Sequence, residues 1–402
     1  MIDFSLTDED RLVRESVRQF VAAEILPNIR AWDERGEAHP EVFAKMGELG
    51  YLGALIPEVW GGAGMDYVSL AILCEELERA DTAFRVVMSV HVGLNSLALL
   101  QWGTDEQRQR WLVPQAQGTK LATFALTEPG AGTDAASLQT TARRDGDAYI
   151  LNGSKIWISL ADLADHFLVF ATLDRAKKHR GVTAFMLERG MPGLTTGTLH
   201  GKLGIRAGNT GLITLDNVAV PAENRIGEEG EGFLVAMSAI DQGRFTVAAG
   251  AVGLARACLD ASVTYAHQRE TFGQEIGHHQ LVKQMLANMA KGTEIGRLLV
   301  HAHHARDIAG EMACHGAQRR GRARRDPGAR RERLQQRVPS GALPAEQQGG
   351  RHLRGDEPAP HAHPGRLRPG LPGGPADPLR AAPGAGLRSL AGAGRRPMSG
   401  AW

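Results

Sequence analysis

One glycine-rich segment has the residue types and spacing of a ligand-binding turn. Residues 124–134 read Phe-Ala-Leu-Thr-Glu-Pro-Gly-Ala-Gly-Thr-Asp, a short β-type run that enters a turn flanked by the hydroxyls of Thr127 and Thr133. Because glycine has no side chain, such a turn exposes backbone N–H groups and lets a planar, anionic ligand approach closely. The same pattern is also typical of an ordinary surface loop closed by an Asx or Ser/Thr turn.

A second segment joins an aromatic ring to a hydroxyl group. It reads Lys155-Ile156-Trp157-Ile158-Ser159 and follows the first by one expected hairpin. Trp157 could pack on a ligand ring while Ser159 hydrogen-bonds the heteroatoms of that ring. The alternative is that Trp157 is a core residue.

Two later segments carry groups suited to a nucleotide. The first is Asp241-Gln242-Gly243-Arg244, and the second is Arg269-Glu270-Thr271-Phe272-Gly273, which is followed by His279-Gln280. Arginine and a hydroxyl suit a pyrophosphate, and phenylalanine suits the face of an adenine. Taken singly, these residues could instead be helix-surface charges and a core phenylalanine.

The elements that position these segments are expected in the order helical, β, helical. Residues 1–121 are predicted to be helical, beginning with a capping-box pattern at Thr7 and Asp10. An apolar stripe with helical spacing follows, made of Val13, Val17, Phe20 and Val21.

Residues 122–220 are expected to form a β-domain, with hairpin-turn dipeptides at Asp145-Gly146 and Asn152-Gly153. Residues 221–312 return to helical spacing and contain two apolar stripes. These are Leu254, Cys258, Ala261 and Tyr265, and then Val282, Met285, Leu286 and Met289. The predicted fold class is therefore α+β and multidomain, with an N-terminal helical domain, a middle β-barrel-like domain and an incomplete C-terminal helical bundle.

Bulk composition narrows the class of protein. No run of about 18 apolar residues indicates a membrane span, and the N-terminus lacks the basic and apolar regions of a secretory signal. Cys74, Cys258 and Cys314 match no zinc or redox spacing, and the histidines around His301 have no cysteine or carboxylate at ligand spacing. We therefore expect a cytoplasmic protein without a metal site or a membrane partner.

The last ninety residues differ in composition from the rest. Residues 313–402 hold seventeen Arg, no Lys and six acidic residues, a balance of +11, whereas the whole chain has a net charge of only +1. They also hold twelve of the nineteen prolines and no Ile, Phe or Tyr. A chain with so little apolar bulk cannot offset the entropy lost on ordering, so this basic tail is predicted to be disordered.

The four segments together, in this order and spacing, resemble the acyl-CoA dehydrogenase family. Residues 55–64 and 246–254 resemble family segments as well, and the resemblance covers roughly residues 5–310. It implies a helical domain, a middle β-domain and a four-helix bundle, usually assembled as a homotetramer, with FAD bound between the β-domain and the bundle.

The resemblance also implies roles for individual residues. Thr133, Asp241 and Arg244 would bind the acyl-CoA substrate, and four of the residues near the second nucleotide segment would meet the FAD of a neighbouring subunit. The residues expected to bind the cofactor are Phe124, Leu126, Thr127, Gly132, Thr133, Trp157, Ile158, Ser159, Arg269, Thr271, Phe272 and Gln280.

The reaction implied by the resemblance is αβ-dehydrogenation of an acyl-CoA thioester. A carboxylate removes the α-proton while a hydride leaves the β-carbon for the flavin, and hydrogen bonds to the thioester carbonyl acidify the α-carbon. An electron-transfer flavoprotein then reoxidises the flavin.

The carboxylate itself is missing from this chain. In the main branch of the family it is the Glu of a Tyr-Glu-Gly-Thr segment, which does not occur here. Read one nucleotide later with GC-rich codons, His352 to Asp356 permits Ile-Tyr-Glu-Gly-Thr, and Arg325 to Pro339 permits the family's preceding segment. We therefore hypothesise a frameshift between residues 305 and 325 that impairs the enzyme.

Two alternatives stay open. The chain could be a flavin oxidase, monooxygenase or acyl-ACP-type member of the same fold that uses another base. It could also be a non-catalytic interaction protein that binds nucleic acid through the basic tail. The near absence of aromatic residues in that tail and its scattered arginines argue against nucleic acid.

Overall fold

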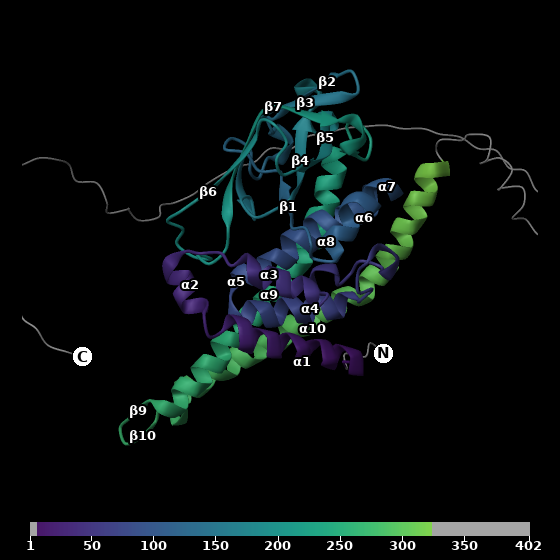
Figure 1. The fold of residues 1–402 in the computed structure, drawn as a ribbon. Coiled ribbons are helices and arrows are strands. Elements are labelled where there is room, and N and C mark those ends of the chain that lie inside the picture. Colours follow the sequence, from purple (N-terminus) through teal and green to yellow (C-terminus); the bar gives the residue numbers. More distant parts are fainter. Residues whose placement is uncertain (1–5, 324–402) are drawn as a thin grey trace, which may run out of the picture. The chain divides into compact units, whose positions relative to one another are not determined.

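The fold is taken from a computed structural model, which describes residues 6–323 and their side chains as far as residue 302. The predicted disorder and the nucleic-acid role of the tail therefore fall largely outside the described residues. Helices come first, strands follow, and two long helices end the described chain (Figure 1). The predicted order of elements is confirmed.

The N-terminal helices bury one apolar face as the sequence indicates. The side chain of Thr7 and that of Asp10 form the predicted capping box at the start of the first helix. The four apolar residues of its stripe are all buried. The principal helices here are α1 (Asp8–Phe20), η1 (Val21–Ile25), α2 (Ile29–Arg35), α3 (Pro40–Glu48), α4 (Tyr67–Ala80), α5 (Thr82–Val87), η4 (Met88–Ser96), α6 (Leu97–Trp102), α7 (Asp105–Gln107), η5 (Arg108–Leu112) and α8 (Val113–Ala116).

The β-domain is a single sheet in the order β6-β7-β3-β2-β4-β5-β8, with β1 paired in parallel with β4. Antiparallel pairing dominates, as expected for strands joined by short turns. The strands are β1 (Ala122–Ala125), β2 (Thr141–Asp145), β3 (Ala148–Ser159), β4 (His166–Thr172), β5 (Val182–Glu188), β6 (Leu194–Thr198), β7 (Thr210–Pro221) and β8 (Arg225–Ile226).

Only one of the two predicted hairpin dipeptides forms a hairpin. Asp145-Gly146 begins the turn between β2 and β3, as expected. Asn152-Gly153 instead lies inside β3, where the register with β7 shifts between Leu151 and Gly153. A Cβ at Gly153 would lie 2.5 Å from the Thr140 hydroxyl, so this glycine serves a β-bulge and a close contact.

Two long helices, α9 (Gly232–Gln268) and α10 (Gln280–Ala323), form the C-terminal part. They are joined by a small hairpin of β9 (Glu270–Thr271) and β10 (Gln274–Glu275). The backbone of α10 continues eleven residues past the predicted end of the helical region at residue 312. The prediction that structure ends there was wrong, because a helix depends on backbone hydrogen bonds and can extend beyond its apolar pattern.

Helix α9 packs closely on α4. A Cβ at Gly253 would lie only 2.1 Å from the carbonyl oxygen of Glu75, so no side chain fits at this crossing. By length and composition, Thr82–Trp102 and Gly232–Gln268 would both pass as membrane spans, which the search for apolar runs did not predict. The first is 83% buried inside the protein, as expected of a core helix.

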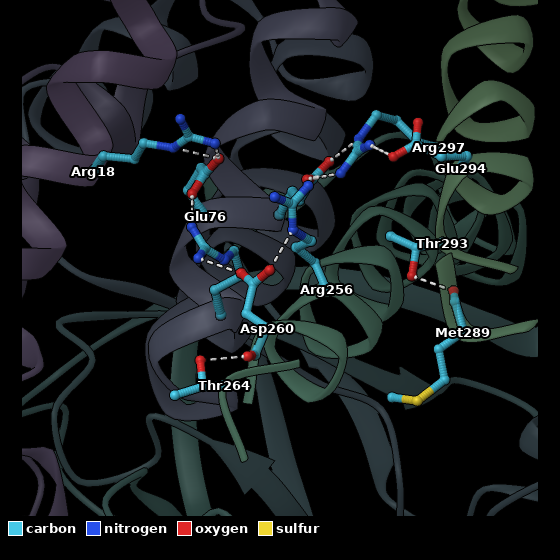
Figure 2. A network of polar contacts seen from close by, with 11 residues as sticks. Arg18, Glu76, Arg256, Asp260, Thr264, Met289, Thr293, Glu294 and Arg297 are labelled. Carbon is cyan, nitrogen blue, oxygen red and sulfur yellow. Dashed lines mark hydrogen bonds and ion pairs between the residues drawn. The ribbon is translucent and has the colours of Figure 1, made fainter. Parts of the chain in front are cut away.

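A network of charged side chains links α1, α4, α9 and α10 (Figure 2). Glu75 of α4 accepts two hydrogen bonds from the guanidinium of Arg297 of α10, at 2.7 and 3.1 Å. Glu76 pairs with Arg18 of α1 at 2.8 Å. Buried carboxylates of this kind need such partners, so the network fixes which helix faces meet.

The predicted apolar stripes of α9 and α10 are largely exposed in the described chain. Leu254 and Tyr265 of α9 are more than half exposed, and so is Met285 of α10. Other large apolar side chains exposed on these two helices are Leu234, Val247, Val263, Leu281, Ile295, Leu298 and Leu299. The two helices thus present faces that a bundle core would normally cover.

Candidate functional site

The glycine-rich turn is tight and open on one side. The backbone N–H groups of Glu128 and Ala131 each donate to the other's carbonyl oxygen, at 3.0 and 3.1 Å. A Cβ added at Gly130 or Gly132 would meet no atom within 4 Å. Packing within the chain therefore does not demand these glycines, and the open space beside the backbone fits close approach by a ligand.

Trp157 is presented outward by a distorted strand. Its backbone has φ 61°, and it lies at a register shift between β3 and β7 that separates Ile156 from Ile158. The side chain is 63% exposed, so the alternative of a core tryptophan is wrong. A left-handed backbone at a bulky residue is uncommon and concentrates at functional sites, which agrees with a ring held ready for stacking.

The far end of β3 is tied to β1. The Thr123 hydroxyl donates to the carbonyl oxygen of Ser159 at 2.6 Å. Asn95, fully buried in η4, donates its amide N–H to the carbonyl oxygen of Thr123 at 2.7 Å. The sequence analysis missed Asn95, since nothing local marks a helical asparagine as support for two strands.

Some predicted residues can reach a ligand only through their backbone. The side chains of Leu126 and Ile158 are buried in the two hydrophobic cores. The ring of Phe124 is half-buried and lies 4.9 Å from that of Phe170. Gly132 and Thr133 are exposed, and Thr127 is half-buried beside them. The structure thus brings the first two segments together in one place.

A buried ion pair lies beneath this place. Lys155, with no exposed surface, donates from Nζ to Oε1 of Glu128 at 2.8 Å and to the carbonyl oxygen of Leu126 at 3.1 Å. Burial lowers the pKa of Lys155 to about 8, although Glu128 opposes that shift. Burial alone would raise the pKa of Glu128, but Lys155 and two backbone N–H groups more than offset it, so that pKa is lowered.

Asp241 and Arg244 form an exposed ion pair on α9, with 2.7 Å between nitrogen and oxygen. Both line an open cleft of about 520 Å³ whose apolar wall includes Phe245 of α9 and Leu299 of α10. The Tyr67 hydroxyl donates to Gln242 at 2.7 Å and anchors this stretch to α4. A cleft with a charged rim and an apolar wall suits a ligand with both kinds of group.

The remaining predicted residues lie elsewhere in this chain. Arg269, Thr271 and Phe272 belong to the β9–β10 hairpin and Gln280 begins α10, at the end of these helices remote from the main sheet (Figure 1). Phe272 is 97% exposed. One copy of the chain therefore does not bring them to Trp157, and their expected role in a neighbouring subunit's site stays a prediction.

Comparison with known proteins decides the family. The models of the N-terminal, middle and C-terminal domains of acyl-CoA dehydrogenases match residues 7–119, 123–218 and 230–323 respectively. The chain belongs to the acyl-CoA dehydrogenase family. Its resemblance to that family, inferred from four short segments, is confirmed.

Individual relatives cover most but not all of the chain. The short-chain specific acyl-CoA dehydrogenase of Clostridium acetobutylicum is 40% identical over 300 residues, which are 75% of this chain and 79% of that protein. A chain in a solved structure of the electron transferring flavoprotein of Acidaminococcus fermentans is 39% identical with a TM-score of 0.75. That match covers 77% of this chain and 81% of the other.

Acyl-CoA dehydrogenases are FAD-dependent. The glutaryl-CoA dehydrogenase of Mycobacterium smegmatis, solved with FADH2, is 35% identical with a TM-score of 0.71, over 75% of this chain and 76% of that one. The residues of this chain fit the cofactor. The open backbone at Gly130 and Gly132 and the outward ring of Trp157 provide the contacts that a planar flavin needs.

Proposed function

We propose that this chain carries the flavin and thioester contacts of an acyl-CoA dehydrogenase but lacks the base that the reaction needs. The observation that carries the first half is the outward Trp157, at φ 61°, on the strand that supports an open glycine-rich turn. Holding a bulky residue in that backbone conformation costs free energy, which a ligand-stacking role would explain.

The turn and β3 would hold the flavin, and the cleft on α9 would hold the thioester substrate. Thr127 and Ser159 would supply hydrogen bonds beside the ring of Trp157, while Asp241 and Arg244 would flank the CoA portion. Bound FAD supplies the hydride acceptor for the β-carbon of the substrate. The role of this chain's residues is to position the two partners face to face and to exclude water.

No carboxylate near the turn is free to act as the base in the described part of the chain. Glu128 is held by Lys155, and its lowered pKa weakens it as a proton acceptor. Asp134 accepts a hydrogen bond from the Ser137 hydroxyl, and Asp241 pairs with Arg244. This supports the hypothesis that the base was lost with the normal C-terminal frame, whose Glu codon spans Arg354 and Gly355.

The extent of the family match supports the same conclusion. The three relatives above align over 75–77% of this chain, and the C-terminal family model ends at residue 323. The basic tail begins at the same point in the sequence. We infer that a frame change, natural or from sequencing, replaced the remainder of the bundle.

Substrate and partners follow from the relatives. We propose a short acyl chain, because the Clostridium acetobutylicum relative is short-chain specific. We further propose an electron-transfer flavoprotein as the oxidant of the flavin, a homotetramer as the assembly of the intact form, and the cytoplasm as the location, where three well-separated cysteines stay reduced.

The purified chain tests this proposal. Titration with FAD followed by a dye-reduction assay with butyryl-CoA should show weak flavin binding and no turnover above background, because the base is absent. Nucleotide sequencing across the codons of residues 305–325 is the companion measurement. A yellow protein that turns over butyryl-CoA, with the present frame verified in the DNA, would overturn the proposal.

A further inference from the structure

The buried pair of Lys155 and Glu128 joins the two segments that make up the flavin side of the site. Lys155 lies on β3 two residues before Trp157, and Glu128 follows Thr127 at the start of the glycine-rich turn. Both side chains are almost fully buried, and the 2.8 Å contact between them links residues 27 positions apart. Neither residue is among those that would touch the flavin or the thioester.

The Glu128 carboxylate also closes the loop that follows the turn. Oε1 accepts the backbone N–H of Thr140 at 2.9 Å, and Oε2 accepts that of Gln139 at 2.5 Å. Residues 128–140 are thereby held at both ends by one side chain. A carboxylate with three charge-assisted or N–H donors is a strong local restraint.

Lys155 adds two restraints on the entry to the turn. Its Nζ donates to the carbonyl oxygen of Leu126 at 3.1 Å, and the neighbouring Ile156 N–H donates to the carbonyl oxygen of Thr127 at 3.0 Å. The backbone on both sides of Thr127 is therefore attached to β3 immediately before the bulge that turns Trp157 outward.

The bulge explains how one strand serves both purposes. In a regular strand residues two apart share a face, so Lys155 and Trp157 should have similar exposure. They differ completely, since Lys155 is buried and Trp157 is exposed, because the register shift reverses the direction of the second side chain.

We propose that Lys155 and Glu128 are positioning residues that fix the glycine-rich turn against β3, so that Thr127 and Trp157 keep a set separation for a planar ligand. The identity of that ligand as a flavin rests on the proposed function. The restraint itself does not, because it is a property of residues 126–140 and 155–157 alone.

Hydrogen exchange of the full chain tests the restraint without any ligand. K155M and E128Q should each speed exchange of the amides in residues 127–140 at least about tenfold more than that of amides in β4. The matched control is R85M, which breaks a second buried ion pair, between Glu78 and Arg85, away from the turn. R85M should lower overall stability while leaving the turn no looser than β4.

The double variant E128Q/K155M guards against simple loss of folding. It removes both charges, so overall stability should recover relative to the single variants, whereas the turn should remain faster to exchange than in the wild type. Turn and β4 amides that change in parallel in K155M, E128Q and the double variant would overturn the proposal.

Flavin binding provides a second readout. If the wild-type chain binds FAD, K155M should raise its Kd by about tenfold to a hundredfold, and R85M should not, since a small misplacement of a binding group is costly. An unchanged Kd in K155M would contradict the positioning role. A wild-type chain that binds no FAD bears on the proposed function, and the exchange measurement then decides the inference.

Discussion

His91 is fully buried beside β1, and its hydrogen bonds define its charge state. The backbone N–H of Ala122 donates to Nδ1 at 3.0 Å, so that nitrogen must be an acceptor, and Nε2 donates to the carbonyl oxygen of Gln115 at 3.1 Å. Burial lowers the pKa of His91 to about 4, against the opposing effect of the Gln115 contact. The ring is therefore neutral in the folded protein.

This histidine makes stability depend on pH. The folded pKa lies below the unfolded value of 6.5, so as pH falls from 6.5 to 4 only the unfolded chain gains the proton. The stabilisation is present above pH 6.5 and lost on acidification, amounting to about 2 kcal/mol between about pH 7 and pH 5. Urea unfolding at these two pH values should show a smaller loss in H91Q. Equal losses would show that His91 is not responsible.

The strained backbone at Trp157 gives a second residue-scale prediction. With φ at 61°, glycine should be tolerated better than alanine at this position. We expect W157G to exceed W157A in free energy of unfolding by about 1 kcal/mol, the reverse of the usual order in strands. Urea unfolding compares the two variants. A more stable W157A would mean that this backbone is not strained.

At the scale of elements, one ion pair docks α10 onto α4. The side chains of Glu75 and Arg297 are both largely buried, and the guanidinium makes two bonds to the carboxylate (Figure 2). R297M should lower the free energy of unfolding by about 3–5 kcal/mol, because it leaves a buried charge unpaired. The measurement is urea unfolding monitored by circular dichroism.

The control for this prediction lies in the same network. Arg256 pairs with Asp260 at 2.8 Å, and both side chains are more than a third exposed. R256A should therefore cost less than about 1 kcal/mol. Similar losses in R256A and R297M would mean that burial does not set the strength of these pairs.

Local signals predicted some of these elements well. The capping box at Thr7, the stripe that includes Val17 and the hairpin at Asp145-Gly146 are set by neighbours in sequence, and all three occur as predicted. Asn152-Gly153 failed because Thr140, from another strand, decides its geometry. The outward direction of Trp157 likewise depends on pairing with β7, which sequence spacing does not reveal.

The candidate site was predictable only in part for the same reason. Its motifs lie in continuous segments, which a resemblance can identify. The supports Asn95, Lys155 and Glu128 act across elements, and their importance depends on burial and distance. The Arg269 to Gln280 group shows a further limit, since one chain alone cannot place residues expected to serve a neighbouring subunit.

At the scale of the whole molecule, the family fold is present but its last part is not family sequence. Apolar side chains of α9 and α10, such as Leu254 and Met285, are exposed where a complete bundle would cover them. We expect the chain with the restored frame to bury them. It should show a higher free energy of unfolding and bind less of a hydrophobic dye than the present chain.

Reduction of bound flavin by butyryl-CoA under anaerobic conditions tests the central claim most directly. The present chain and the frame-restored chain would each be reconstituted with FAD, and bleaching of the flavin absorbance would be followed after substrate is added. The restored chain should bleach rapidly, and an otherwise identical chain with its recovered Glu changed to Gln should not. Rapid bleaching by the present chain, or none by the restored one, would contradict the claim that the normal frame holds the missing base.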